Sequence, residues 1–84
     1  MVEKTVFVVQ AFEMQRKKPA PTTKTDAPSE SAAMKRAESI AARAGGAAVI
    51  ALTLDTETGE VSKAAILARY GEVPDDLDQL VESF

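Results

Sequence analysis

At 84 residues, with 45% hydrophobic and 27% charged side chains and a net charge of −3, the sequence fits one small globular domain spanning residues 1–84. It contains no Cys and no His, which excludes disulfides and thiolate nucleophiles and removes the commonest metal ligand and general base. We therefore expect a protein that is not an enzyme and that has no catalytic residues, no metal and no cofactor.

The apolar runs of the sequence are short. The longest, Ala47–Leu52, falls far below the roughly 20 residues that an apolar helix needs to cross a bilayer. The first fifteen residues lack the apolar helix and the small-residue cleavage site of a signal peptide. We therefore expect a cytoplasmic protein with no membrane partner.

The first predicted strand is Thr5–Phe12, which is rich in β-branched and aromatic residues. Both of its faces are apolar near its start, whereas a strand with one wet face would alternate apolar and polar residues. Both faces of this strand must therefore be covered.

Residues 16–28 are basic and rich in Pro and Thr, with Pro19, Pro21 and Pro28 among them, and Ala is their only other apolar residue type. A segment of this kind buries too little surface to offset the entropy of ordering it. We expect an exposed, flexible loop that leads to the first helix.

The main predicted helix spans Ser29–Ala44. Ser29 or Ser31 is suited to cap its N-terminus, and Gly45-Gly46 ends it. Its apolar stripe consists mainly of Ala, which allows close packing on a sheet.

A β-hairpin is predicted from Ala47–Leu54 and Val61–Tyr70, joined by the polar segment Asp55–Glu60. Gly59 stands where such a turn needs a positive φ. The segment also resembles a calcium loop, but its Gly is fifth rather than sixth and the twelfth residue is Ile66. A plain turn is therefore the better interpretation.

A second, short helix is predicted over Pro74–Phe84. Its apolar residues recur at helical spacing: Leu77, Leu80, Val81 and Phe84. A helix of this length is stable only when its apolar stripe is docked. These four residues are therefore the candidate interaction residues.

Together these elements predict an α+β fold of order β-α-β-β-α, with a three-stranded, mainly antiparallel sheet packed by one Ala-rich helix and a short C-terminal helix. The favoured strand order is first, third, second, with antiparallel neighbours. In the alternative order, the first two strands pair in parallel through a right-handed crossover.

Basic residues are concentrated in the first half of the sequence. Residues 1–42 carry seven basic and five acidic side chains, whereas residues 43–84 carry three and eight. A negative overall charge repels phosphate, so nucleic-acid binding would depend on a local basic patch. The candidate patch consists of Arg16, Lys17, Lys18 and Lys24.

Four pieces of the sequence carry a resemblance: Val6–Phe12, Ala33–Ala44 with Gly45-Gly46, Asp55–Glu60 and Tyr70–Pro74. In these pieces the chain resembles small uncharacterised proteobacterial proteins, some of them associated with prophages. The resemblance implies a bacterial cytoplasmic origin and a compact α+β domain, and it brings no catalytic residues.

The leading functional hypothesis is a non-enzymatic protein–protein interaction or regulatory module. We expect it to be a homodimer or to bind a protein partner, through its sheet face, a sheet edge or the C-terminal helix. The alternative is a weak nucleic-acid-binding accessory protein that uses the basic loop.

Overall fold

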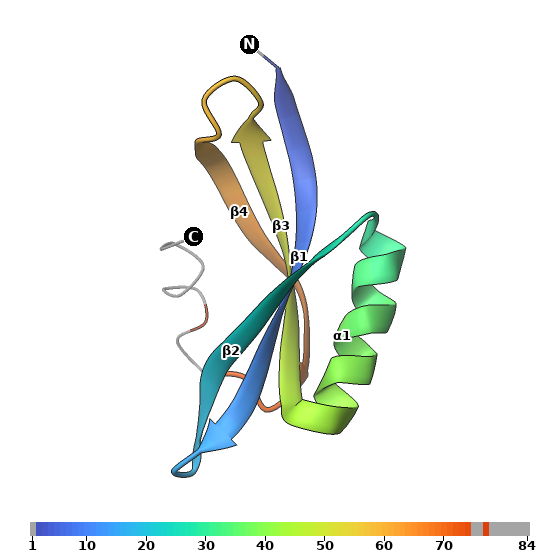
Figure 1. Cartoon of the computed structure of the whole chain (residues 1–84), viewed down its shortest axis with the longest axis vertical. Helices are drawn as coiled ribbons and strands as arrows, with labels where there is room; N and C mark the ends of the chain where they lie inside the picture. Colours follow the sequence, from blue (N-terminus) through green and yellow to red (C-terminus); the bar gives the residue numbers. More distant parts are fainter. Residues whose placement is uncertain (1, 75–76, 78–84) are drawn as a thin grey trace.

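The computed structural model describes residues 2–74 and Leu77. Its four strands form one sheet in the order β2-β1-β3-β4, in which every neighbouring pair is antiparallel. One helix, α1, packs against one face of this sheet (Figure 1). In chain order the elements are β1 (Glu3–Gln15), β2 (Lys18–Ala27), α1 (Glu30–Ala44), β3 (Gly45–Asp55) and β4 (Val61–Gly71).

The three predicted strands and the main helix are present. The Ser29 side chain caps α1 by accepting a hydrogen bond from the backbone N–H of Ala32 at 3.1 Å. The Ala stripe faces the sheet, with Ala33 and Ala37 fully buried. In the turn between β3 and β4, Gly59 has a φ of 77° and its N–H donates to the carbonyl of Asp55 at 2.8 Å. The prediction of a plain hairpin turn is therefore confirmed.

The predicted fold class is wrong, because the described part of the chain contains four strands and one helix rather than three strands and two helices. The additional strand is β2, which comes from the Pro-rich segment predicted to be a flexible loop. Proline cannot donate to a sheet ladder, but it is tolerated in a strand at the edge of a sheet. β2 is such an edge strand, and Pro19 and Pro21 lie within it opposite Met14 and Phe12.

A buried glutamine helps to hold β2 in place. Gln10 is only 1% exposed, and its Nε2 donates to the carbonyls of Ala11 at 3.0 Å and Thr23 at 3.2 Å. These bonds lie beside an irregularity in the β1–β2 register, between Gln10 and Phe12. Gln10 therefore adds side-chain hydrogen bonds to the backbone at the point where the ladder is irregular.

The favoured strand order, with the third predicted strand between the first two, is also wrong, because β1 pairs directly with β3. The alternative order correctly made these two strands neighbours, but it made them parallel, whereas the pair is antiparallel. β2 reverses the direction of the chain before α1 begins, so β3 runs antiparallel to β1. A direct crossover from β1 through the helix would have made β3 parallel to β1. The missed strand thus accounts for the error in strand order.

The predicted C-terminal helix lies outside the described residues, except for Leu77. Leu77 is fully buried and packs with Phe12, Ala48 and Ile50. These residues lie on the sheet face opposite α1, which we call the far face. The far face is therefore covered at this point by the chain's own Leu77.

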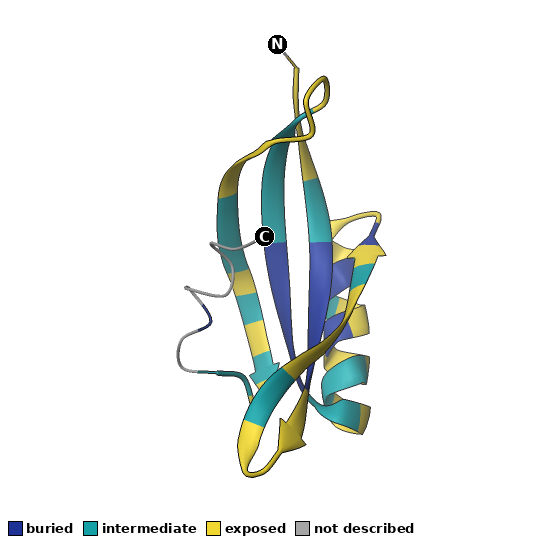
Figure 2. Ribbon diagram, turned by 60° about the vertical axis from the view of Figure 1, so that its left-hand side comes forward, coloured by how far each residue is buried: buried dark blue, intermediate teal, exposed yellow. Residues whose placement is uncertain are grey.

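The core has two layers, one on each side of the sheet. On the α1 side, the fully buried residues are Val9, Ala33, Ala37, Ala47 and Val49. Burial is concentrated in the middle of β1 and in the first half of β3, and it decreases toward the N-terminus of β1 (Figure 2).

The lengths of the elements explain this gradient. The 13 residues of β1, at about 3.3 Å each, span about 43 Å. The 15 residues of α1, at about 1.5 Å each, span only about 22 Å. The helix can therefore cover only about half of the strand, and the sheet extends beyond it.

Candidate interaction surfaces

The part of the sheet beyond α1 and β2 is the first candidate surface. We call it the projecting end, and it consists of Glu3–Val6 of β1, Leu52–Asp55 of β3 and Val61–Ala64 of β4. β2 pairs with β1 only from Phe7 onward. The outer edge of Glu3–Val6 therefore has no strand partner within the described part of the chain.

The two faces of the projecting end differ in polarity. Residues that pair directly across an antiparallel ladder share a face. On the α1 side, Thr5 pairs with Thr53 and Glu3 with Asp55. On the far face, Val6 pairs with Leu52, and Leu52 also pairs with Ala64. One face is therefore polar and the other apolar.

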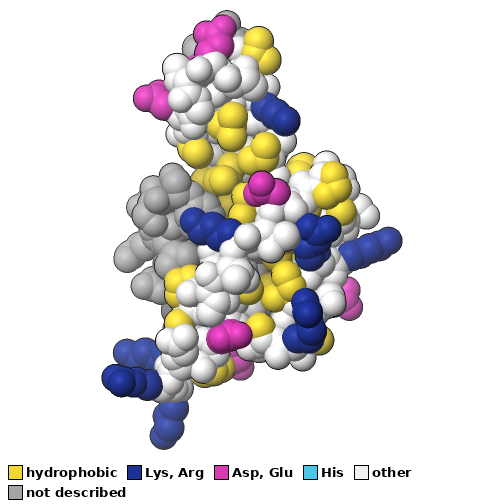
Figure 3. Space-filling model, viewed as in Figure 1, with side chains coloured by type: hydrophobic (Ala, Val, Ile, Leu, Met, Phe, Trp, Pro, Cys, Tyr) yellow, Lys and Arg dark blue, Asp and Glu magenta, His cyan; other side chains and the backbone are white. Residues whose placement is uncertain are grey.

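The apolar side of the projecting end is only partly covered. Val6, Leu52 and Leu54 are half-buried, and Val61 is 39% exposed. A hollow of about 600 Å³ beside the open edge of β1 is lined in part by Val6, Val8, Leu52 and Leu54. Figure 3 shows hydrophobic side chains gathered at this end of the molecule.

Polar side-chain contacts support the strand pairing at the projecting end. The hydroxyls of Thr5 and Thr53 lie 3.4 Å apart. Just beyond the projecting end, Thr56 donates to the carbonyl of Val2 through its backbone N–H at 3.0 Å and its hydroxyl at 3.1 Å. These contacts order the strands without burying their apolar face.

The second candidate surface is a groove between α1 and β2, which run side by side in opposite directions (Figure 1). Its upper part has a volume of about 600 Å³, and a second hollow of about 360 Å³ shares Thr25, Ile40 and Arg43 with it. The lining residues of the upper part are Thr25, Ala32, Lys35, Arg36, Ser39, Ile40 and Arg43. Three of these seven residues are cationic and none is acidic.

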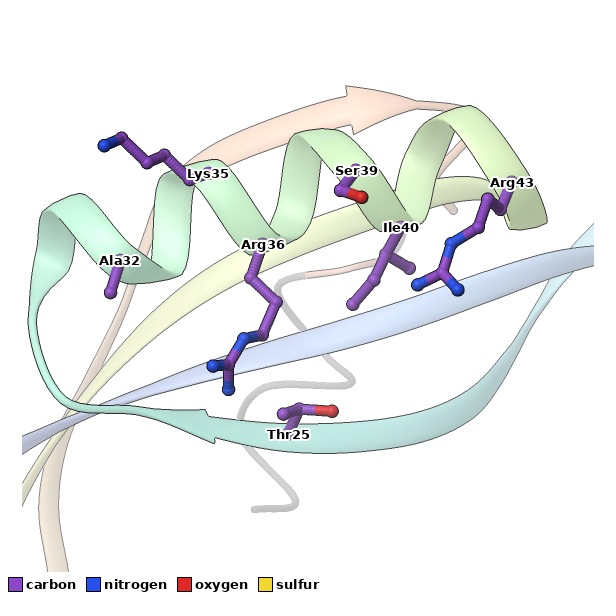
Figure 4. Close-up of a pocket in the computed structure, with 7 residues that line it drawn as sticks. All are labelled: Thr25, Ala32, Lys35, Arg36, Ser39, Ile40 and Arg43. Atoms are coloured by element: carbon purple, nitrogen blue, oxygen red, sulfur yellow. The ribbon is translucent and has the colours of Figure 1, made fainter.

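Two arginines extend from α1 toward β2, on either side of Ile40 (Figure 4). Arg36 donates from Nη1 to the backbone carbonyl of Asp26 at 2.8 Å. Lys35 points away from β2, along the outside of the helix. The positive charge within this groove, which we call the α1–β2 groove, therefore comes mainly from Arg36 and Arg43.

The predicted basic patch is only partly assembled. Arg16 and Lys17 form the turn between β1 and β2, and Lys18 begins β2. We call these three residues the basic tip. Lys24 pairs with Gln10 and therefore shares the far face with it. Lys24 thus lies on the opposite side of β2 from the α1–β2 groove.

Sequence reasoning did not single out Arg36 and Arg43 as candidate site residues. Their spacing of seven residues puts them on one flank of α1, and Glu38 falls on the other flank. This spacing was visible in the sequence. The strand that forms the other wall of the groove was not predicted, so nothing marked that flank as a site.

Of the four predicted interaction residues in the C-terminal segment, the structure describes only Leu77. Leu77 is buried in the core of the far face, so its side chain is not available to a partner. Leu80, Val81 and Phe84 lie outside the described residues.

The described residues offer neither a metal site nor a membrane-spanning helix. Within residues 2–74 and Leu77, no cluster of three or more His, Cys, Asp or Glu residues is placed to hold a metal ion. Over the same residues, no helix has both the length and the apolarity to span a membrane.

No protein family, curated protein or solved structure matches this chain. The resemblance to proteobacterial proteins therefore stays a prediction, and the functional argument depends on the two surfaces described above.

Proposed function

We propose that this protein is a non-enzymatic interaction module that forms a homodimer through the apolar face of its projecting end. The observation that carries this proposal is the mismatch between a strand of about 43 Å and a helix of about 22 Å. It leaves an amphipathic half-sheet whose apolar side is continuous with the core of the far face.

The continuity of the two apolar regions supports packing against another sheet. Leu52, Ala64 and Ile66 pack against the buried far-face cluster while remaining partly accessible. Antiparallel sheets commonly bury one apolar face against a second sheet at a separation of about 10 Å. A second copy of the chain offers a surface of the same shape and polarity.

A two-fold axis would bring identical apolar patches together. Such an interface is self-complementary because each residue meets the same surface on the partner. Val6, Leu52 and Leu54 would lie near its centre. Lys4, which pairs with Leu54, would lie at the rim, where its charged end remains in water.

Mutation of Leu54 tests the proposal without disturbing the core, because Leu54 is not part of either buried cluster. Leu54→Asp places a charge on the apolar face and leaves it beside Lys4. Light scattering behind a sizing column, from low to high micromolar protein, should show a concentration-dependent dimer for the wild type. The same measurement should show a folded monomer for Leu54→Asp.

Thr53→Asp is the matched control. It adds the same charge one residue away, but on the polar face of the projecting end, so the dimer should persist. A wild-type protein that remains monomeric at high micromolar concentration would contradict the proposal. So would equal dimerisation of the wild type and Leu54→Asp.

We also propose that this interaction module is cytoplasmic. A chain without Cys needs no oxidising environment to fold. This supports a cytoplasmic module, and localisation of a tagged full chain in a bacterial host would test the assignment.

A further inference from the structure

We propose that the α1–β2 groove and the basic tip together bind the phosphate backbone of double-stranded nucleic acid. This site is separate from the projecting end, and the inference does not depend on dimerisation.

The α1–β2 groove is positively charged. Arg36 and Arg43 are seven residues apart on α1, which corresponds to about 10 Å along the helix axis. Within the described part of the chain, no ion pair engages either side chain. Among the described residues that line the groove, the one acidic side chain is Glu13, in its lower part. Two guanidinium groups therefore face a hollow that supplies almost no compensating charge.

The groups in the groove are suited to phosphate. Guanidinium groups bind phosphate oxygens through paired N–H donors, and hydroxyls add further donors. The hydrogen bond from Arg36 to the carbonyl of Asp26 holds one guanidinium in place before a ligand arrives. Thr25 contributes a hydroxyl from the opposite wall. Such preorganisation lowers the entropy cost of binding.

The basic tip provides the second, independent observation. Arg16 and Lys17 have φ angles of 52° and 69°, in the left-handed region. Two-residue hairpin turns of this kind strongly prefer Asn-Gly, because a left-handed residue with a β-carbon costs roughly 1–2 kcal/mol. Two cations therefore occupy positions where they weaken the fold, and such strain is typical of functional positions.

The length of the charged surface points to a polymer. Lys18 lies seven residues before Thr25 on β2, which corresponds to about 23 Å at about 3.3 Å per residue. Arg36 lines the groove together with Thr25, so cations lie near both ends of this distance and cannot contact one phosphate group together. A chain of repeated phosphates can occupy the groove and the tip at once.

The placement of the aromatic residues favours a duplex over a single strand. Single-stranded nucleic acid is bound largely by stacking its bases on exposed aromatic side chains. Among the described residues, Phe12 is fully buried, and Phe7 and Tyr70 pack against the core. None of these aromatic rings lines the groove. Contacts to the backbone of a duplex need no such rings.

Titration of a fluorescently labelled DNA duplex of mixed sequence, repeated at increasing salt, tests the inference. Five cations contribute to the site: Arg16, Lys17, Lys18, Arg36 and Arg43. If each neutralises one phosphate, the logarithm of the binding constant falls with the logarithm of salt with a slope of about −4.5. Because the protein carries a net charge of −3, we expect measurable binding mainly at low salt.

The double variant Arg16→Asn with Lys17→Gly separates binding from folding. It installs the preferred turn residues, so the melting temperature should stay the same or rise. The salt slope should decrease to about −2.7, because two phosphate contacts are lost. Lys4→Gln with Lys63→Gln removes the same charge from the projecting end and should leave the slope unchanged.

Several outcomes would overturn the inference. These are an absence of duplex binding at low salt, an unchanged affinity in the Arg16→Asn/Lys17→Gly variant, and an equal loss in the Lys4→Gln/Lys63→Gln control. Tighter binding to a single strand would contradict the duplex assignment. Equal competition by poly-glutamate would indicate an acidic polypeptide as the ligand instead of phosphate.

Discussion

The two halves of the sheet are made from the same strands but are stabilised in different ways. In the covered half, Val9 and Val49 are fully buried between α1 and the far face. In the projecting end, Thr5 and Thr53 share a hydroxyl contact on one side, while Leu52 and Leu54 are half-buried on the other. The difference follows from the length of α1, which covers only one half of the sheet. The covered half therefore contributes most of the buried core, whereas the projecting end keeps an open apolar surface.

The largest expected effect is in the covered half, where β3 begins. A β-carbon on Gly46 would overlap the backbone carbonyl of Glu72, and a backbone group cannot move aside as a flexible side chain can. We expect Gly46→Ala to cost about 4 kcal/mol or more, a large part of the total stability of a small domain. Chemical denaturation followed by circular dichroism would measure this loss.

Gly59→Ala is the control for Gly46→Ala, because it makes the same substitution in the turn beyond the projecting end. Nothing lies within 4 Å of the added β-carbon at Gly59, so only its φ of 77° opposes the change. The cost should be about 1–2 kcal/mol. Equal losses at the two glycines would show that the covered half is not the more tightly packed region.

A pair of truncations compares the two halves at positions on the same strand and the same face. Ile50 is fully buried with Phe12 and Leu77, so Ile50→Ala should cost about 2–5 kcal/mol. Leu54 is half-buried and outside that cluster, so Leu54→Ala should cost about 1 kcal/mol or less when measured on the monomer. Urea unfolding at low protein concentration gives both values.

The reverse order of the Ile50→Ala and Leu54→Ala losses would contradict the structural account. If the loss of stability in Leu54→Ala grows with protein concentration, this would support the proposed dimer, because dimerisation stabilises the folded state by mass action.

The elements with strong periodicity could be predicted from the sequence. The Ala stripe of α1, its cap at Ser29 and the turn at Gly59 are all local patterns, and the structure contains each of them. The need to cover both faces of β1 was also visible in its composition. Local patterns predict local structure because each depends on neighbours only a few residues away.

β2 could not be predicted in the same way. Its prolines and threonines favour a loop by composition, and only pairing with β1 makes an edge strand of them. Because β2 was predicted as a loop, the strand order was also predicted incorrectly. The α1–β2 groove was not predicted either, since β2 forms one of its walls. Arg36 and Arg43 therefore became a candidate site only when β2 was placed beside α1.

Hydrogen exchange at low and high protein concentration tests most directly whether a second copy covers the projecting end. Few buried contacts hold this end, so its amides should open locally at low cost in the monomer. We predict that the amides of Val6, Leu52 and Leu54 gain protection as the protein concentration rises, while those of Val9 and Val49 do not change. Protection of the first three amides that is independent of concentration would contradict the account.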